Sequence, residues 1–498
     1  MNPRLRQTLI GLAASVVAVW LGWEIADRSF FWPVLAAVVA LAAILVRLTR
    51  LPFDVITLGL AVFGYIVGNR GFAQLSLSGT FPVLPAEFVL LVAGGILAVQ
   101  SVFRRELPVR RDVLNLALLV WIAVGGFRIL FDFRVHGFTA VRDFATIYYA
   151  LFFFVAQQQA RDDAARRFLL GSLLVGTITL LPVFGLFQLF PEFFLSTLTF
   201  RGIPLVFYKN DLVYTFLAAG SVIVFHLAAG KRWRFLGYLG ALLLGGFVLV
   251  GNSRATLMGL VTAIVWLLVG RRTAYAKAMI GGGLCVALGL LLATWLSGRD
   301  WRDSGLFVVY ERAASVFDPQ GARAYASAEL ADKPDNNRFR MVWWHSVVAE
   351  TWQEAPVFGL GFGYDLAENF LHIYDLGDDF VTRSPHSILI TVIGRMGLVG
   401  LLPFLVMMGS MAARTWRAVR RTAAGDTVGM SLWCCAWIIL VSACFGVVLE
   451  GPMGAVVFWT MLGVASATSA AEREQRDEEN AASAAAEPAT LDAPPAPV

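Results

Sequence analysis

The sequence has few charged residues for its length, and this scarcity excludes most soluble architectures. Of its 498 residues only 15% are charged, whereas 58% are hydrophobic and the mean hydropathy is +0.69. A soluble domain has about 25% charged and about 45–50% apolar residues. The strict alternation of a membrane β-barrel is also absent. The apolar residues lie in blocks of about 17–22, close to the roughly 20 that cross a bilayer as a helix. The sequence therefore predicts an all-α integral membrane protein.

Cysteine and histidine are scarce as well, with four and five residues. All four cysteines lie inside apolar blocks, so we expect no disulfides on the outer face. No Cys/His spacing is typical of a metal site, and we predict neither a metal nor another cofactor. The first apolar block has no clear small-residue cleavage site, and further blocks follow at once, so we expect no cleavable signal peptide.

The apolar blocks define about fourteen spans, or twelve if two of them are not separate spans. The predicted spans are 8–25, 31–48, 53–69, 86–102, 113–132, 142–159, 168–190, 211–229, 235–251, 254–270, 277–296, 386–412, 431–449 and 451–468. The span at 168–190 contains Pro182, and only a tight turn around Glu450 separates the last two. We thus expect about 12–14 transmembrane helices.

These spans predict four regions. Residues 1–296 form the N-terminal transmembrane helices, 297–385 a large, partly helical periplasmic loop, and 386–469 the C-terminal transmembrane helices. Residues 470–498 are rich in Ala, Glu and Pro, and we expect a disordered cytoplasmic tail.

Lysine and arginine gather in alternate loops, which predicts the orientation. The basic loops contain Arg47/Arg50, Arg104/Arg105/Arg110/Arg111, Arg161/Arg166/Arg167, Lys231/Arg232/Arg234, Arg271/Arg272/Lys277 and Arg414/Arg417/Arg420/Arg421. Loops of this kind face the cytoplasm. With an even number of spans, both termini are cytoplasmic and the long loop lies outside. The net charge of +5 reflects these loops and does not indicate binding to nucleic acid.

A second basic set lies on the predicted outer side, where the same rule disfavours it. Its members are Arg128, Arg134, Arg142, Arg201, Lys209, Arg254, Arg338, Arg340 and Arg383. One explanation is an anionic ligand such as a diphosphate, because guanidinium groups bind phosphate through paired donors. The alternative is contact with lipid headgroups, or ion pairs with Asp and Glu.

Arg254 is the most informative member, because it lies where a short outer turn becomes a helix, in the string GNSRATLMGLV. A helix N-terminus offers free amide donors to an anion. A cation at that positive end costs stability unless an anion is present.

The large loop contains an apparent helix from Arg338 to Trp352, in the string RFRMVWWHSVVAETW. Its tryptophans could stack on sugar rings or anchor the helix at the membrane interface. Pro356 ends the helix, and a glycine-spaced segment that is flexible or tightly turned follows. His386 then opens the next span.

These features occur in a distinctive order. First comes an Arg in a short outer turn (SRA), and a long loop follows it. The loop contains Arg-x-x-x-Trp from Arg340 and then Pro-x-x-Gly-x-Gly from Pro356. His386 stands at the end of the loop, and Gly-x-x-Gly from Gly397 lies in the next span. This pattern, over about residues 195–405, resembles the superfamily of bacterial O-antigen ligases and O-antigen or exopolysaccharide polymerases. One departure is Ser387, where the family often has Asn after the histidine.

The resemblance implies a GT-C-type glycosyltransferase in the bacterial inner membrane. Such an enzyme transfers a glycan from an undecaprenyl-diphosphate-linked saccharide to an acceptor sugar hydroxyl at the periplasmic face, without a nucleotide sugar or a metal. The acceptor is lipid A core for a ligase and another lipid-linked glycan for a polymerase, and the sequence does not separate the two.

The resemblance also implies roles for particular residues. The family's Arg in the short turn corresponds to Arg254, its loop His to His386, and a further outer-loop Arg to Arg201. Together with Arg338 and Arg340, these arginines are the predicted diphosphate-binding set. Guanidinium groups would stabilise the leaving diphosphate. The neutral imidazole of His386 would accept the proton of the acceptor hydroxyl as the catalytic base.

The alternative function is a transporter or flippase for a lipid-linked or anionic substrate. That function predicts ionisable residues in the middle of the spans. Here they gather near one face, except for Arg395, which lies nine residues into its predicted span and could pair with Glu450 or a backbone carbonyl.

Overall fold

The computed structural model describes most of the chain. The described residues are 15–24, 26, 31–76, 84–105, 109–200, 202–228, 232, 234–251, 253–298, 300–316, 318, 322–327, 333–374, 383–421 and 427–486.

These residues are almost entirely helical. The elements before a short β-hairpin are α2 (Phe31–Thr49), α3 (Phe53–Val67), α4 (Asn69–Gln74), α5 (Pro85–Arg104), α6 (Val113–His136), α7 (Phe138–Tyr148), α8 (Leu151–Gln159), α9 (Asp163–Leu189) and η1 (Phe193–Thr197). The hairpin pairs β1 (Thr199–Phe200) with β2 (Ile203–Pro204) in antiparallel register.

The elements after the hairpin are α10 (Asn210–Ala228), α11 (Arg234–Val250), α12 (Arg254–Val269), α13 (Thr273–Leu296), η2 (Trp301–Asp303), α14 (Gly305–Val316), α15 (Lys333–Glu354), α16 (Glu368–Tyr374), α17 (Ile388–Arg421), α18 (Val428–Cys444) and α19 (Pro452–Ala486).

The chain is an all-α membrane protein, as predicted. Within the described residues, eight helices are long and apolar enough to cross a membrane, and four further apolar helices are shorter. Thirteen of the predicted spans, from 31–48 onward, fall on helices, and the span at 142–159 is made of α7 and α8 placed end to end. Of the span at 8–25, the described residues 15–24 are helical. Pro182 does not interrupt α9, which continues to Leu189.

Two boundaries differ from the predictions. The helix α18 ends at Cys444, so the last two spans are joined by a non-helical link over residues 445–451 rather than by a tight turn at Glu450. The tail expected to be disordered from about residue 470 is instead helical as far as Ala486. Alanine and glutamate are strong helix formers, and extending an existing helix avoids the cost of nucleation.

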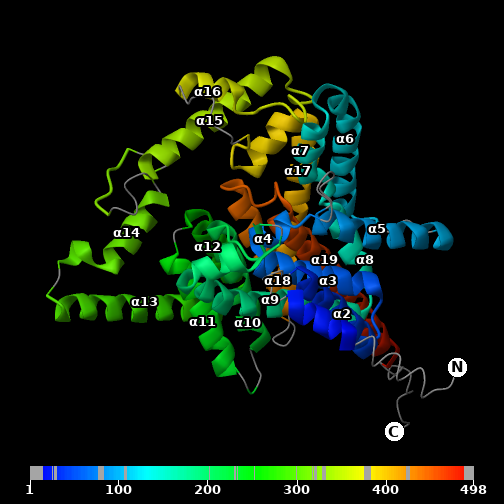
Figure 1. Ribbon diagram of the computed structural model, residues 1–498, viewed down its shortest axis with the longest axis horizontal. Coiled ribbons are helices and arrows are strands. Elements are labelled where there is room, and N and C mark those ends of the chain that lie inside the picture. Colours follow the sequence, from blue (N-terminus) through cyan, green and yellow to red (C-terminus); the bar gives the residue numbers. More distant parts are fainter. Residues whose placement is uncertain are drawn as a thin grey trace, which may run out of the picture.

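The last two helices form the centre of the bundle (Figure 1). The spanning part of α19 is 83% buried, and large side chains such as Trp433 and Trp459 are fully buried. By contrast, α5 and α13 project from opposite sides of the bundle. Of the residues in their apolar, membrane-length stretches, only 17% and 6% are buried. The central position of α18 and α19 means that the link between them can contact several other elements.

The glycine-spaced segment after α15 is tightly turned and locks into a break in α17. Gly397 has φ +57° inside α17 and interrupts the helix. The amides of Leu398 and Val399 instead donate to the carbonyls of Pro356 and Val357, at 3.0 and 3.1 Å. The two glycine motifs of the sequence therefore form one interlocked structure, which attaches the end of the large loop to the span that follows it.

Replacement of Gly359 by alanine is expected to disrupt this interlock. Gly359 has φ +73°, and an added Cβ would lie 2.4 Å from the backbone nitrogen of Met396. Backbone strain alone costs about 1–3 kcal/mol, and the clash with a helix backbone adds to it. We expect Gly359→Ala to lose more than about 3 kcal/mol of stability, measured by thermal unfolding in detergent. Gly298→Ala is the matched control, because Gly298 has φ +65° but nothing within 4 Å of the added Cβ. Equal losses in the two variants would contradict the interlock.

Candidate active site

A pocket of about 110 Å³ lies between α12, α15 and the link that joins α18 to α19. Its polar lining includes Arg254 and Arg340, and its apolar lining includes Met258, Trp344 and Phe445. We call this space the cation pocket. A pocket with two arginines beside apolar side chains suits a ligand that joins an anionic group to a lipid.

Arg254 is the first residue of α12, directly after Ser253, whose side chain caps the helix by accepting from the Thr256 amide. A guanidinium nitrogen of Arg254 lies 3.4 Å from the carbonyl oxygen of Ser315 in α14. The sequence thus predicted correctly that an Arg begins this helix, and α14 of the large loop lies over it.

Arg340 reaches the same pocket from α15, on the opposite wall. Its Nη1 atom donates to the carbonyl of Phe445 at 2.8 Å. Burial lowers the pKa of Arg340, and Asp211 opposes this effect. Two guanidinium groups that approach one space from different elements repel each other unless an anion lies between them.

A second, smaller cavity adjoins the cation pocket and shares Ala255 and Phe445 with it. Lys209 and Asp211, at the start of α10, contribute its charged lining. Burial lowers the pKa of the Lys209 amine, Arg70 and Arg340 lower it further, and Asp211 raises it. The Lys209 amide donates to Asn69 Oδ1 at 3.0 Å, which fixes this loop against α4.

His386 lies beside these cations, just before α17. Burial lowers the pKa of its imidazole to about 4, and the positive charges of Arg340 and Lys209 add to the shift, whereas Asp211 opposes it. The backbone of His386 has φ +55°, a left-handed conformation that is uncommon for a residue other than glycine. Its imidazole is therefore neutral at pH 7 and is held in a defined position.

The tryptophans of α15 help to hold the segment that contains His386. Trp343 is fully buried, stacks on Phe370, and meets the His386 ring edge-on at 5.9 Å between centroids. The Trp344 indole donates to the carbonyl of Pro385 at 2.6 Å and also lines the cation pocket. Trp352 is exposed. Of the three, Trp344 is thus the one placed to contact a ligand.

Three of the five predicted site residues come together here, namely Arg254, Arg340 and His386. Arg338 is exposed and does not line the cation pocket. Arg201 lies outside the described residues. The roles of all five stay predictions.

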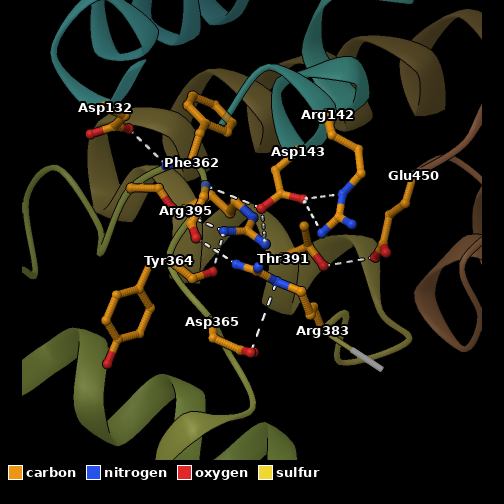
Figure 2. A network of polar contacts seen from close by, with 12 residues as sticks. Asp132, Arg142, Asp143, Phe362, Tyr364, Asp365, Arg383, Thr391, Arg395 and Glu450 are labelled. Atoms are coloured by element: carbon orange, nitrogen blue, oxygen red, sulfur yellow. Dashed lines mark hydrogen bonds and ion pairs between the residues drawn. The ribbon is translucent and has the colours of Figure 1, made fainter. Parts of the chain in front are cut away.

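Several other arginines of the set predicted on the outer side form ion pairs instead, in agreement with the alternative explanation. Arg128 pairs with Asp132 at 2.9 Å and Arg142 with Asp143 at 3.4 Å. Arg383 lies 3.9 Å from Asp365. Figure 2 shows Asp132, the Arg142–Asp143 pair, and Arg383 with Asp365 around Phe362 of the glycine-spaced segment.

Arg395, the exception inside a span, is at the centre of this network (Figure 2). It pairs with Asp143 at 2.8 Å and donates to the carbonyls of Gly361 and Tyr364 at 3.1 and 2.8 Å. The expected backbone partner is confirmed, but the paired carboxylate belongs to Asp143 rather than Glu450. Arg395 therefore holds the large loop against α7 and α17.

Asp211 is a site residue that the sequence reasoning missed. It is the carboxylate that acts on Lys209, Arg254, Arg340 and His386 together. The available signal was the charged string Lys209–Asn210–Asp211 directly before an apolar span on the outer side.

Comparison with known protein families gives one match. Residues 239–405 match the family model described as O-antigen ligase. Over this segment the chain is similar to that family. A comparison with individual curated proteins finds no match. The match supports a glycosyl-transfer role, of the ligase or polymerase kind, for this multi-pass membrane protein.

The family segment contains part of the site only. Arg254, Arg340 and His386 lie inside residues 239–405, together with the interlocked glycine motifs. Lys209 and the link at 445–451 lie outside it. Elements beyond the segment that matches the O-antigen ligase model thus complete the site.

Proposed function

We propose that the chain transfers a glycan from an undecaprenyl-diphosphate-linked saccharide to an acceptor sugar hydroxyl at the periplasmic face of the bacterial inner membrane. The observation that carries the proposal is the meeting of Arg254 and Arg340 in one pocket, with the neutral His386 beside it. The acceptor is lipid A core if the enzyme is a ligase, or a second lipid-linked glycan if it is a polymerase.

The donor's diphosphate lies in the cation pocket between Arg254 and Arg340. These guanidinium groups face the oxygen that becomes negatively charged as the glycosidic bond breaks. The apolar lining around Met258 accepts the first part of the lipid chain. In this proposal the cations that face the diphosphate are side chains, and no metal takes part.

The reaction is a single displacement at the anomeric carbon. His386 takes the proton of the acceptor hydroxyl, and the hydroxyl oxygen forms the new glycosidic bond. The old C–O bond breaks, and its electron pair leaves with the diphosphate. Attack opposite the leaving group inverts the configuration of that carbon. The protonated His386 then releases its proton to water.

Binding of the donor prepares His386 for this role. Burial, together with the charges of Arg340 and Lys209, keeps the pKa of the imidazole near 4, which makes it neutral but weakly basic. A bound diphosphate neutralises these cations, so the pKa of His386 rises toward the working pH. General bases act best when their pKa lies near that pH.

The charge distribution along α17 supports the proposed orientation. His386 precedes this helix, and the basic cluster from Arg414 to Arg421 lies at its other end. Because basic clusters mark the cytoplasmic side, His386 faces the periplasm, and with an even number of spans both termini are cytoplasmic.

The surface glycans of a deletion strain test the function. The strain is complemented with the native gene or with His386→Ala. Loss of glycan from lipid A core, with long lipid-linked chains accumulating, is the result expected for a ligase. Single repeat units in place of long chains are expected for a polymerase, and His386→Ala should not restore either defect. An unchanged glycan profile without the gene, where no second enzyme of this kind exists, would favour the transporter.

A further inference from the structure

The second cavity, next to the cation pocket, has room for about one oxygen atom, and we call it the small cavity. Its volume is about 10 Å³, and a water-sized group needs about 10–15 Å³. Ala255 and Phe445 line both spaces. An atom in the small cavity therefore lies directly beside a ligand in the cation pocket and can belong to that ligand.

The residue that points to a ligand in the small cavity is Ser442 of α18. Only 1% of Ser442 is exposed, and its Oγ atom has no hydrogen-bond partner among the described residues. The other hydroxyls of the lining are satisfied. Thr215 donates to the carbonyl of Asp211 at 2.7 Å, and Ser253 Oγ lies 2.9 Å from a threonine hydroxyl. A buried hydroxyl without a partner is unfavourable, so Ser442 favours a ligand atom that accepts a hydrogen bond.

Lys209 brings a positive charge to the same cavity. In the part of the chain that the structure describes, its amine pairs with no carboxylate, whereas Arg395 and Arg414 each form an ion pair. Burial lowers the pKa of the amine, and the carboxylate of Asp211, which also lines the cavity, opposes the shift. Asp211 thus helps to keep the amine charged. The ammonium and the Ser442 hydroxyl are both donors for an anionic oxygen.

The backbone that carries Lys209 is fixed by α4. The amide of Phe207 donates to the carbonyl of Gly68 at 3.3 Å, and the amide of Gly71 donates to the carbonyl of Phe207 at 3.1 Å. The Lys209 amide donates to Oδ1 of Asn69 at 3.0 Å, and Asn69 is fully buried. The position of Lys209 beside the cavity is therefore set by the fold.

We propose that the small cavity is a further subsite for the donor's diphosphate, in which Lys209 and Ser442 both donate to one phosphate oxygen. The other oxygens of the diphosphate lie between Arg254 and Arg340 in the cation pocket. The inference rests on the proposed function, which supplies the lipid diphosphate. It goes beyond the family match, because Lys209 and Ser442 both lie outside residues 239–405.

Binding of undecaprenyl diphosphate to the full-length chain tests the subsite without requiring transfer. The protein is placed in phosphatidylcholine nanodiscs, and microscale thermophoresis measures Kd. Lys209→Gln removes the charge, and we expect Kd to rise about 10–100-fold, the usual size for a hydrogen bond between charged groups. Ser442→Ala should raise Kd about tenfold. Lys277→Gln is the matched control and should keep the native Kd, because this exposed lysine of α13 lines neither cavity.

Thermal unfolding separates the subsite from a structural role of Ser442. Ser442→Ala removes a buried hydroxyl that has no partner among the described residues, so Tm should stay the same or rise while binding weakens. In the double variant with Lys209→Gln, the rise in Kd should be smaller than the product of the two single rises, because both donors share one oxygen. Ser442→Ala tests the subsite even if Lys209→Gln does not fold.

A native Kd in folded Lys209→Gln or in Ser442→Ala would overturn the subsite, and so would rises in Kd that multiply in the double variant. Arg254→Gln is measured in parallel. If Arg254→Gln also binds like the native protein, the diphosphate does not lie in the cation pocket and the proposed function fails. If Arg254→Gln binds more weakly while Lys209→Gln and Ser442→Ala do not, only the subsite fails.

Discussion

Replacement of His386 by asparagine should abolish glycan transfer while the protein stays folded. Asparagine adopts the left-handed conformation more readily than other residues with a side chain, so it can keep the φ of +55° found at this position. It cannot accept a proton from a hydroxyl at neutral pH. General-base catalysis contributes about 10²–10⁴ to a rate, and we expect kcat to fall by at least 100-fold. Initial rates with purified protein and lipid-linked donor measure the effect.

The choice of asparagine separates chemistry from folding. His386→Ala should be equally inactive, but alanine is less suited to the left-handed backbone, so its melting temperature should lie below that of His386→Asn. Thermal unfolding of both variants provides this control. A His386→Asn protein that transfers glycan at the native rate would refute the assignment of the base.

Most of the helices could be predicted from the sequence, because a membrane helix needs a long apolar block and leaves a strong hydropathy signal. The residue at which α18 ends could not be predicted from the sequence. Residues 445–449 are apolar, so hydropathy assigns them to the helix, whereas their carbonyls and side chains serve contacts that form only in the folded bundle. The bond from Arg340 to the Phe445 carbonyl is one of these contacts.

The same limit applies to the candidate site. Arg254, Arg340 and His386 could be proposed as site residues because their order and spacing are visible in the chain. Asp211 was missed as a site residue, because only the packing of α10 brings it near the others. The local signal, a charged string at 209–211 directly before an apolar span, does not by itself show that the carboxylate of Asp211 lies near His386.

Arg338 is a different case, because helix geometry alone separates it from Arg340. Two residues apart on a helix is close to half a turn, so both side chains cannot face one pocket. The structure places Arg340 in the cation pocket and leaves Arg338 exposed. The prediction that both bind the diphosphate therefore grouped two residues on opposite faces of α15.

Replacement of Arg340 by glutamine should both slow the reaction and change its dependence on pH. Loss of one fixed donor to a developing negative charge costs about 10²–10³ in rate, and we expect a fall in kcat of this size. Arg340 also lowers the pKa of His386, so its removal raises that pKa above the native value of about 4. The base is active when neutral, so the native kcat/KM should stay constant from pH 8 down to about 5.

In Arg340→Gln, kcat/KM should start to fall at a higher pH than in the native enzyme. Arg340→Lys keeps the charge but loses the paired donors, so its rate should fall while its pH profile stays near the native one. Arg338→Gln, on the exposed face of the same helix, is the matched control and should keep the native rate and profile. If kcat/KM of the native enzyme falls to half its plateau value near pH 6.5, the imidazole is not shielded from protonation by these cations. An unchanged profile in Arg340→Gln would show that Arg340 and His386 do not act in one site.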